Sequence, residues 1–350
     1  MRRALHWSGL AAVWLLLLAT IAWSSAALWF DGPSQPPLAG LLAAGFALAA
    51  LTLLVAIRPF WRGLVAYAVL FAVVLAWWHS LAPSNDRNWQ RDVANPTTAV
   101  IDGDQLTIHN LRNFDYRSTD DYTPRWETRT YDLSRLIGMD IYFFYWGSPW
   151  MAHTIVSWDF EDGPPLAISI ETRKEVGEQY SAVRGFFRQF ELYYVVADER
   201  DVVRLRTNQR GDEGYLYRLD WSPDDARALL LAYLAEVNRI ARSPSWYNAF
   251  DHNCTTTIRF HVRQIGIERA WNWRILANGK APELLYMRGV VNTTMPFPEL
   301  QSRSHVNERG RAAGNAPDFS QRIRDGLPPR PPPRASRRSG PAPPAEMNGQ

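Results

Sequence analysis

Three long runs without charged residues, all near the N-terminus, constrain this chain more than any other feature. Residues 7–30 and 38–57 carry no charge, and a third run starts at residue 63 and continues without charge to Asn85. A helix that spans a bilayer needs about 20 predominantly apolar residues. We therefore expect an N-terminal transmembrane region, residues 1–82, with spans at about residues 8–30, 38–57 and 63–82.

Basic residues at the ends of these runs predict their orientation. Arg2 and Arg3 precede the first run, and Arg58 and Arg62 lie between the second and the third. The positive-inside rule places both pairs on the cytoplasmic side. The linker of residues 31–37 and everything after residue 82 are then expected outside the cytoplasm.

Two other interpretations of the first run and of the topology stay open. The first run could be a secretory signal peptide cut near residues 24–27, where small residues gather. Two spans would then remain, and they would still leave residue 83 onward outside. The other alternative is a soluble domain that faces the cytoplasm.

The rest of the chain divides by composition. Residues 83–310 have the mixed composition of a globular domain, and about 230 residues are enough for one core. Residues 311–350 are rich in Pro, Arg, Ala and Ser, which predicts a disordered tail. The net charge of +3 gives no support to nucleic-acid binding, and no metal-ligand spacing, phosphate loop or dinucleotide fingerprint is present.

Many short strands followed by helices predict an α+β fold with an antiparallel sheet. Asp102-Gly103 marks a hairpin turn within residues 98–110, and Ser222-Pro223 marks a helix start. A second helix is expected from Cys254 to Gln264, with Gly266 ending it. The further expected strands are residues 123–133, 140–146, 152–160, 166–173, 192–197, 202–207 and 215–219.

Cys254, the single cysteine, is the leading candidate for chemistry. A helix that starts there exposes backbone N–H groups, which stabilise a thiolate and can also hold an oxyanion. A buried, inert cysteine is an equally frequent outcome for this residue type. The local sequence alone does not separate the two.

A thiol nucleophile needs a base, commonly histidine. Of the seven histidines, His153 and His252 are the candidates, and His252 is too close to Cys254 in sequence to be placed. If residues 161–165 close an antiparallel hairpin centred near residue 162, His153 faces Glu171 on the next strand. Glu171, or Ser169 on the same face, could then orient the imidazole as the third member of a triad.

A charge-rich segment, residues 199–206, has two possible roles. It contains Glu199, Asp201, Arg204 and Arg206. Such a cluster can bind phosphate or carboxylate, but a salt-bridged strand face is the simpler interpretation.

Four segments, in this order along the chain, resemble the Lnb N-terminal periplasmic domain family. They are residues 153–160, 169–174, 194–206 and 247–256, within a resemblance that covers about residues 85–300. His153, the acid on the next strand and a cysteine far downstream at a helix start are in the reverse order of papain. This order resembles the circularly permuted NlpC/P60 arrangement, a papain-like thiol fold.

The resemblance implies a lipoprotein N-acyltransferase that needs no cofactor. An acyl chain would move from a phospholipid to the α-amine of a lipoprotein through a cysteine thioester. Carried over by position, Cys254 is the nucleophile, His153 the base and Glu171 the orienting acid. Candidate substrate-binding residues within the matched segments are Asn253, Thr255, Tyr247 and Ser169.

The resemblance also implies a multi-pass protein of the inner membrane whose catalytic domain faces the periplasm. Three spans would hold that domain at the bilayer, where an acyl donor is concentrated. Two other functions stay open: a cysteine peptidase or amidase on cell-wall peptides, and a non-catalytic envelope module.

Overall fold

The computed structural model describes residues 2–250, 254–267 and 270–333, with side chains from residue 8 onward except that of Cys254. The described chain forms two compact units. The helical unit contains the residues up to Ser84 together with Tyr180–Glu191 and Trp246–Asn248. The sheet unit contains the remaining described residues.

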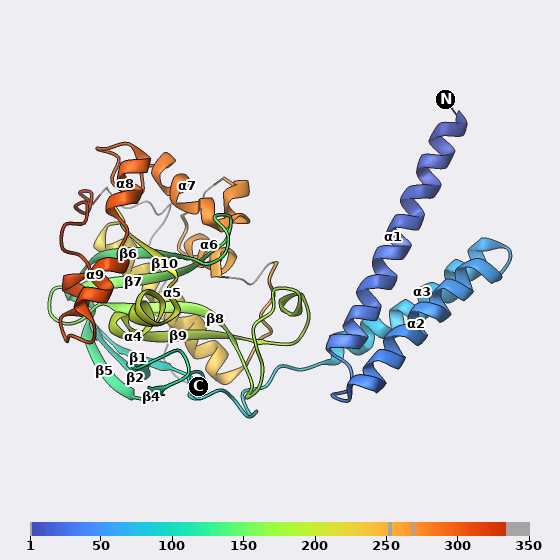
Figure 1. Cartoon of the computed structure of the whole chain (residues 1–350), viewed down its shortest axis with the longest axis horizontal. Coiled ribbons are helices and arrows are strands. Elements are labelled where there is room, and N and C mark those ends of the chain that lie inside the picture. The colour runs from blue at the N-terminus through green and yellow to red at the C-terminus, as the bar shows by residue number, and fades with distance from the viewer. Residues whose placement is uncertain (1, 251–253, 268–269, 334–350) are drawn as a thin grey trace. The chain divides into compact units, whose positions relative to one another are not determined.

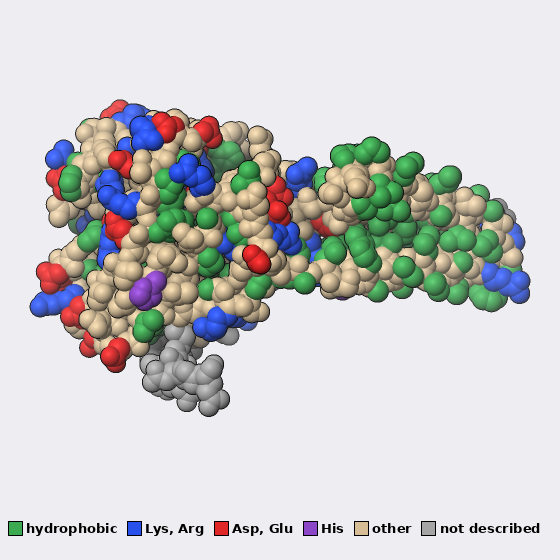
Figure 2. All heavy atoms as spheres, turned by 90° about the horizontal axis from the view of Figure 1, so that it is seen from below, with side chains coloured by type: hydrophobic (Ala, Val, Ile, Leu, Met, Phe, Trp, Pro, Cys, Tyr) green, Lys and Arg blue, Asp and Glu red, His purple; other side chains and the backbone are tan. Residues whose placement is uncertain are grey.

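Three helices build most of the helical unit: α1 (Arg2–Phe30), α2 (Pro36–Ala56) and α3 (Phe60–Ser80). All three are long and apolar enough to cross a membrane, as the sequence predicts. They pack through buried side chains that include Ile21, Phe46 and Tyr67, and the Tyr67 hydroxyl donates to Thr20 Oγ1 at 2.8 Å. Hydrophobic side chains cover the outside of these helices, which is the surface that a lipid environment requires (Figure 2).

A distant segment joins this unit. Residues 180–191, which include the short helix η2 (Arg184–Phe186), lie against the linker between α1 and α2. The Asp31 carboxylate accepts from the Trp78 indole at 2.7 Å and from the Gln189 amide at 2.9 Å. The Phe187 and Phe30 rings lie 5.0 Å apart. The linker of residues 31–37 and the segment around residue 188 therefore lie on the same side of the three helices, as the predicted topology requires.

The sheet unit is built on one eight-stranded sheet (Figure 1). Its strand order is β1-β2-β9-β8-β7-β6-β10, and β5 pairs with β2 beside this path. Most pairs are antiparallel, as predicted, but β2 meets β9 in parallel, so the sheet is mixed. The strands are β1 (Thr98–Asp102), β2 (Gln105–Arg112), β5 (Trp126–Asp132), β6 (Leu136–Tyr145), β7 (Ala152–Phe160), β8 (Leu166–Arg173), β9 (Glu191–Asp198) and β10 (Glu213–Arg218).

Helices cover both faces of this sheet. On one face, α5 (Pro223–Arg242) and α6 (Cys254–Gln264) pack against its strands. On the other, α4 (Glu199–Arg204), α9 (Asn307–Ala313) and α10 (Phe319–Arg322) enclose a core that contains Ile155, Ala167 and Val203. The smaller elements are a two-stranded sheet of β3 (Asp115–Tyr116) and β4 (Tyr122–Thr123), and the helices η1 (Leu133–Arg135), η3 (Leu205–Arg210), η4 (Trp273–Ile275), η5 (Asn278–Lys280), α7 (Ala281–Met287) and α8 (Phe297–Arg303).

Several local predictions are confirmed. The first hairpin turns at Gly103, whose φ of 59° suits glycine, between Asp102 and Gln105. The Ser222 side chain caps α5 by accepting from the N–H of Asp225 at 3.2 Å. The helix expected from Cys254 to Gln264 is α6, and Gly266 follows it with a φ of 77°.

The strand predicted at residues 202–207 is wrong. These residues continue from α4 into η3, a π-helical segment. The Asp198 side chain accepts from the N–H of Arg200 and so starts a helix directly after β9. The strand was predicted from the alternation of apolar residues with arginines. On the helix, Arg204 and Arg206 are instead buried and form ion pairs with Asp115 and Glu171.

The predicted boundary of the tail at residue 311 is also wrong for residues 311–333. Phe319 and Ile323 are fully buried in the core beside α4. Arg324 pairs with Asp140 and Glu199, two carboxylates that are themselves fully buried. The prediction used the average composition of residues 311–350, which does not reveal the few residues that pack into the core. Residues 334–350 lie outside the described part of the chain.

Candidate active site

His153 lies one residue from the start of β7 and is buried. The β7–β8 register pairs Ile155 with Ser169, so the hairpin is centred where the sequence predicts. His153 and Glu171 are the next residues outward on the same face.

The structure brings His153, Ser169 and Glu171 into one hydrogen-bonded cluster. His153 Nε2 lies 2.6 Å from Ser169 Oγ and 3.0 Å from Glu171 Oε1, and Ser169 Oγ donates to Glu171 Oε1 at 2.7 Å. The one hydroxyl proton of Ser169 is therefore used on the carboxylate, and Ser169 can only accept from Nε2. This assigns the imidazole proton to Nε2 and leaves Nδ1 as the basic nitrogen.

Arg206 supports the carboxylate from the other side. Its guanidinium donates to Glu171 Oε1 at 3.1 Å and also pairs with Asp212 at 3.1 Å. Burial alone would raise the pKa of the Glu171 carboxyl, but His153, Arg206 and Arg210 hold it well below its ordinary value. Glu171 is therefore a carboxylate at neutral pH, able to orient the imidazole and to stabilise its protonated form.

Three further charges of the segment 199–206, those of Glu199, Asp201 and Arg204, are held in structural ion pairs. Asp201 accepts from both Nε and Nη2 of Arg112, and Arg204 pairs with Asp115. Glu199 pairs with Arg324. The prediction of salt bridges is thus confirmed, although they lie on a helix and not on a strand face.

The predicted nucleophile lies at the start of α6. The helix begins at Cys254, and the three threonines that follow it form its first turn. The side chain of Cys254 and residues His252 and Asn253 lie outside the described part of the structure. The neighbouring Thr255 is described and accepts a hydrogen bond at Oγ1 from the Asn278 amide at 2.9 Å.

Asn278, which the sequence did not single out, ties this helix start to β7. Its amide donates to the carbonyl of Ala152 at 2.6 Å and accepts from the N–H of the same residue at 2.8 Å. Ala152 directly precedes His153, so the Asn278 side chain links the first turn of α6 to the start of β7 beside His153. Gly279 makes the close approach possible, because a Cβ there would lie 2.4 Å from the Pro149 carbonyl oxygen. An Asn-Gly pair in the sequence signals only a turn.

Tyr247, a candidate substrate-binding residue, belongs to the helical unit. Its N–H donates to the Phe190 carbonyl at 2.9 Å within that unit. Of the four candidate binding residues, Ser169 and Thr255 therefore have described side chains in the sheet unit.

His261, on the same helix as Cys254, has a packing role. It is fully buried, with Nε2 2.8 Å from the Tyr194 hydroxyl and Nδ1 2.9 Å from Gln264 Oε1. Burial lowers the pKa of His261 to about 4, against partial opposition from Gln264 and Glu236. The imidazole is therefore neutral in the folded protein at neutral pH.

This burial predicts a pH-dependent stability. The unfolded chain protonates His261 below about pH 6.5, whereas the folded chain does so only near pH 4, so stability falls as pH drops through that window. Between pH 7.5 and 5.5 we expect a loss on the order of 1 kcal/mol from this residue. Thermal unfolding of full-length protein in detergent should show a smaller pH effect for His261→Gln. The exposed His109 supplies the control, because His109→Gln should keep the wild-type pH effect.

Among the residues that the structure describes, no group of three or more His, Cys, Asp or Glu side chains could hold a metal ion. The described site contains a positioned histidine–carboxylate pair, and Asn278 links its strand to the start of a helix. Such a pair transfers protons to and from a nucleophile.

The comparison with protein families gives one match. Residues 122–279 match the family model described as the Lnb N-terminal periplasmic domain. The match contains β5 to β10, α5 and α6, and with them His153, Glu171, Cys254 and Asn278. No curated protein and no solved structure matches the chain.

Proposed function

Residues 122–279 belong to the Lnb N-terminal periplasmic domain family, and from this premise we propose that the protein is a thiol acyltransferase of the inner membrane. The family and the three apolar helices make the chain a membrane protein with a periplasmic domain. The proposal adds the reaction: an acyl chain moves from a phospholipid to the amino terminus of a lipoprotein. It also adds the finer fold, a permuted NlpC/P60-type thiol domain.

The observation that carries the proposal is the hydrogen-bonded cluster of His153, Ser169 and Glu171 near the start of β7. Asn278 links this strand start to the first turn of α6. In the proposed first step, His153 Nδ1 accepts the proton of Cys254, and the thiolate attacks the acyl carbonyl carbon. The ester C–O bond breaks, and the lysophospholipid leaves with the proton from His153. A thioester on Cys254 results.

In the second step, the amine of the acceptor attacks the thioester carbonyl carbon. His153 takes a proton from the amine and returns it to the departing thiolate, so an amide forms and Cys254 regains its thiol. Backbone N–H groups at the start of α6 are suited to hold the oxyanion of both steps. Glu171 stays ionised throughout and stabilises the imidazolium.

Detection of the thioester tests the proposal directly. Full-length protein is incubated with vesicles of phosphatidylethanolamine and phosphatidylglycerol and then analysed by intact mass. We expect one added acyl group that neutral hydroxylamine removes, and none on Cys254→Ala. Addition of a diacylglyceryl-cysteine peptide should discharge the adduct and yield the N-acylated peptide. Release of peptide fragments from cell-wall material without lipid consumption would instead indicate a peptidase.

The two candidates for the third catalytic residue make different predictions. Glu171→Gln should lower kcat about 100-fold. A neutral amide does not stabilise the imidazolium, and its N–H₂ group is a donor that cannot accept from the Nε2 proton. Ser169→Ala should cost about tenfold or less, since the carboxylate can still accept from Nε2. Single-turnover acyl-transfer rates measure both. Glu175→Gln, at a surface ion pair with Arg87, serves as the matched control and should change little. A larger loss in Ser169→Ala than in Glu171→Gln would reverse the assignment.

A further inference from the structure

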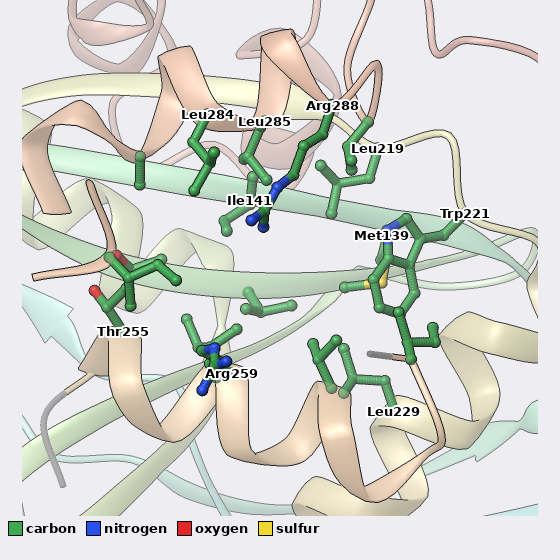
Figure 3. A pocket seen from close by; sticks show the side chains of 18 of the residues that line it. Met139, Ile141, Leu219, Trp221, Leu229, Thr255, Arg259, Leu284, Leu285 and Arg288 are labelled. Atoms are coloured by element: carbon green, nitrogen blue, oxygen red, sulfur yellow. The ribbon is translucent and has the colours of Figure 1, made fainter. Parts of the chain in front are cut away.

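A second feature of the sheet unit is an apolar cavity of about 150 Å³ on the face covered by α5 and α6. Fifteen of its twenty lining residues are apolar, three are arginines, two are threonines, and none of these lining residues is acidic. Ile141 belongs to the sheet side of the cavity, and Leu284 and Leu285 of α7 lie across from it (Figure 3). An apolar cavity of this size holds a ligand of about six carbon atoms, as an engineered cavity of similar volume holds benzene.

The cavity begins beside the candidate active site. Thr255 and Thr154, which line it, are the immediate sequence neighbours of Cys254 and His153. Adjacent residues on a strand face opposite sides of a sheet, so Thr154 points into the cavity while His153 points to the other face. At the start of β7, next to both residues, Asn278 holds Thr255 and Ala152 together.

Two of the arginines give the cavity a charged side. Arg259 of α6 lines the cavity, and Arg288, which follows α7, extends into the space between the two helices (Figure 3). The Arg288 guanidinium also donates to the Ala270 carbonyl at 2.6 Å, which positions it. An apolar wall with cations on two sides complements a ligand that combines a hydrocarbon chain with an anionic group.

We propose that this cavity binds the acyl chain of the phospholipid donor, with its phosphate held by Arg259 and Arg288. The inference rests on the proposed function for the identity of the donor. The apolar residues of β6 and α7 cover the first methylene groups of the chain, and the rest of the chain extends beyond the cavity. Thr255 then lies at the end of the cavity where the acyl carbonyl approaches Cys254.

Photochemical crosslinking tests the location of the chain without requiring turnover. The probe is a phosphatidylglycerol with a diazirine near the sixth carbon of one acyl chain, added in vesicles to full-length Cys254→Ala protein. We expect crosslinked peptides from residues 258–263 and 284–290. Crosslinks confined to the membrane-spanning helices would overturn the proposal. If these peptides are labelled while wild-type protein forms no thioester, the cavity assignment stands and the proposed reaction fails.

Filling the cavity should exclude the chain. Leu285 is half-buried and lines the cavity, so Leu285→Trp adds bulk there at a position that α7 leaves partly open. We expect at least a tenfold loss of crosslinking to residues 258–263. Met287→Trp, on the exposed side of the same helix, is the matched control and should crosslink as the parent protein does. Equal labelling in both variants would contradict the assignment.

The arginines can be tested by competition. Unlabelled phosphatidylglycerol should displace the probe about tenfold better than a diacylglycerol with the same chains, because only the former carries a phosphate. Arg288→Gln should remove this preference. Arg274→Gln changes an arginine that stacks on Trp273 outside the cavity, and it should keep the preference. A preference that survives in Arg288→Gln/Arg259→Gln would show that the phosphate lies elsewhere.

Discussion

Acyl transfer by the Cys254→Ala variant is expected to fall to the uncatalysed level, a loss on the order of 10⁶-fold in kcat. Removal of a covalent nucleophile has an effect of this size because no other group takes over bond formation. The structure supports the role of this position through the start of α6 and through the Asn278 link from Thr255 to Ala152. Single-turnover transfer of a labelled acyl chain to a lipopeptide measures the loss.

The double variant Cys254→Ala/His153→Gln gives the sharper result. If the two residues act as a unit, the second substitution should add almost nothing, because groups of one catalytic unit are strongly non-additive. His153→Gln alone should then cost nearly as much as Cys254→Ala. Acyl transfer near the wild-type rate in His153→Gln, with a lowered Tm, would show that His153 supports folding and not the thiol. Unchanged activity in Cys254→Ala would exclude both enzymatic functions.

Arg324→Met is expected to have the largest effect on stability, a loss of about 3–5 kcal/mol. The guanidinium lies 2.6 Å from a Glu199 oxygen and 2.9 Å from an Asp140 oxygen, and both carboxylates are fully buried. Methionine fills the space but leaves Glu199 without its ion-pair partner. Thermal unfolding of full-length protein in detergent should show a decrease of about 10 °C in Tm.

The pH dependence distinguishes this mechanism from simple loss of packing. Burial would raise the pKa of Glu199, but Arg324 holds it below its ordinary value, so this stabilisation exists above about pH 4.5 and is lost as pH falls further. The stability difference between wild type and Arg324→Met should therefore shrink in acid. Arg322→Met, two residues before Arg324, breaks only an exposed ion pair with Asp318 and should cost at most about 0.5 kcal/mol. A difference that does not change with pH would indicate packing alone.

Local signals predicted much of the fold, including the three apolar helices, the first hairpin, the capped start of α5 and the extent of α6. The candidate site followed from one geometric step. A hairpin centred near residue 162 places His153 opposite Glu171, and the register of Ile155 with Ser169 has that centre. Alternation within a hairpin fixes which side chains share a face, so this relation could be worked out from the sequence.

The elements that the sequence could not predict depend on partners distant in the chain. Arg206 sits on a π-helical segment and reaches Glu171 only because α4 packs against β8. Asn278 lies 126 residues from Ala152 and finds it through the fold of η5 and α7. Tertiary packing overrode the strand propensity of residues 202–207, and nothing local to Asn278 marks it as a link between two elements.

The placement of Arg324 has a consequence for the order of synthesis. Strand β6 and helix α4 leave the ribosome long before Arg324 and Arg330, which lie closer to the buried Asp140 than its third partner, Arg218. Until residues 324–330 are translated, Glu199 lacks Arg324 and Asp140 lacks both Arg324 and Arg330, which leaves these carboxylates poorly compensated in the nascent sheet. The sheet unit can therefore complete its native core only after residues 319–330 have been translated, which makes this segment the closing element of its folding.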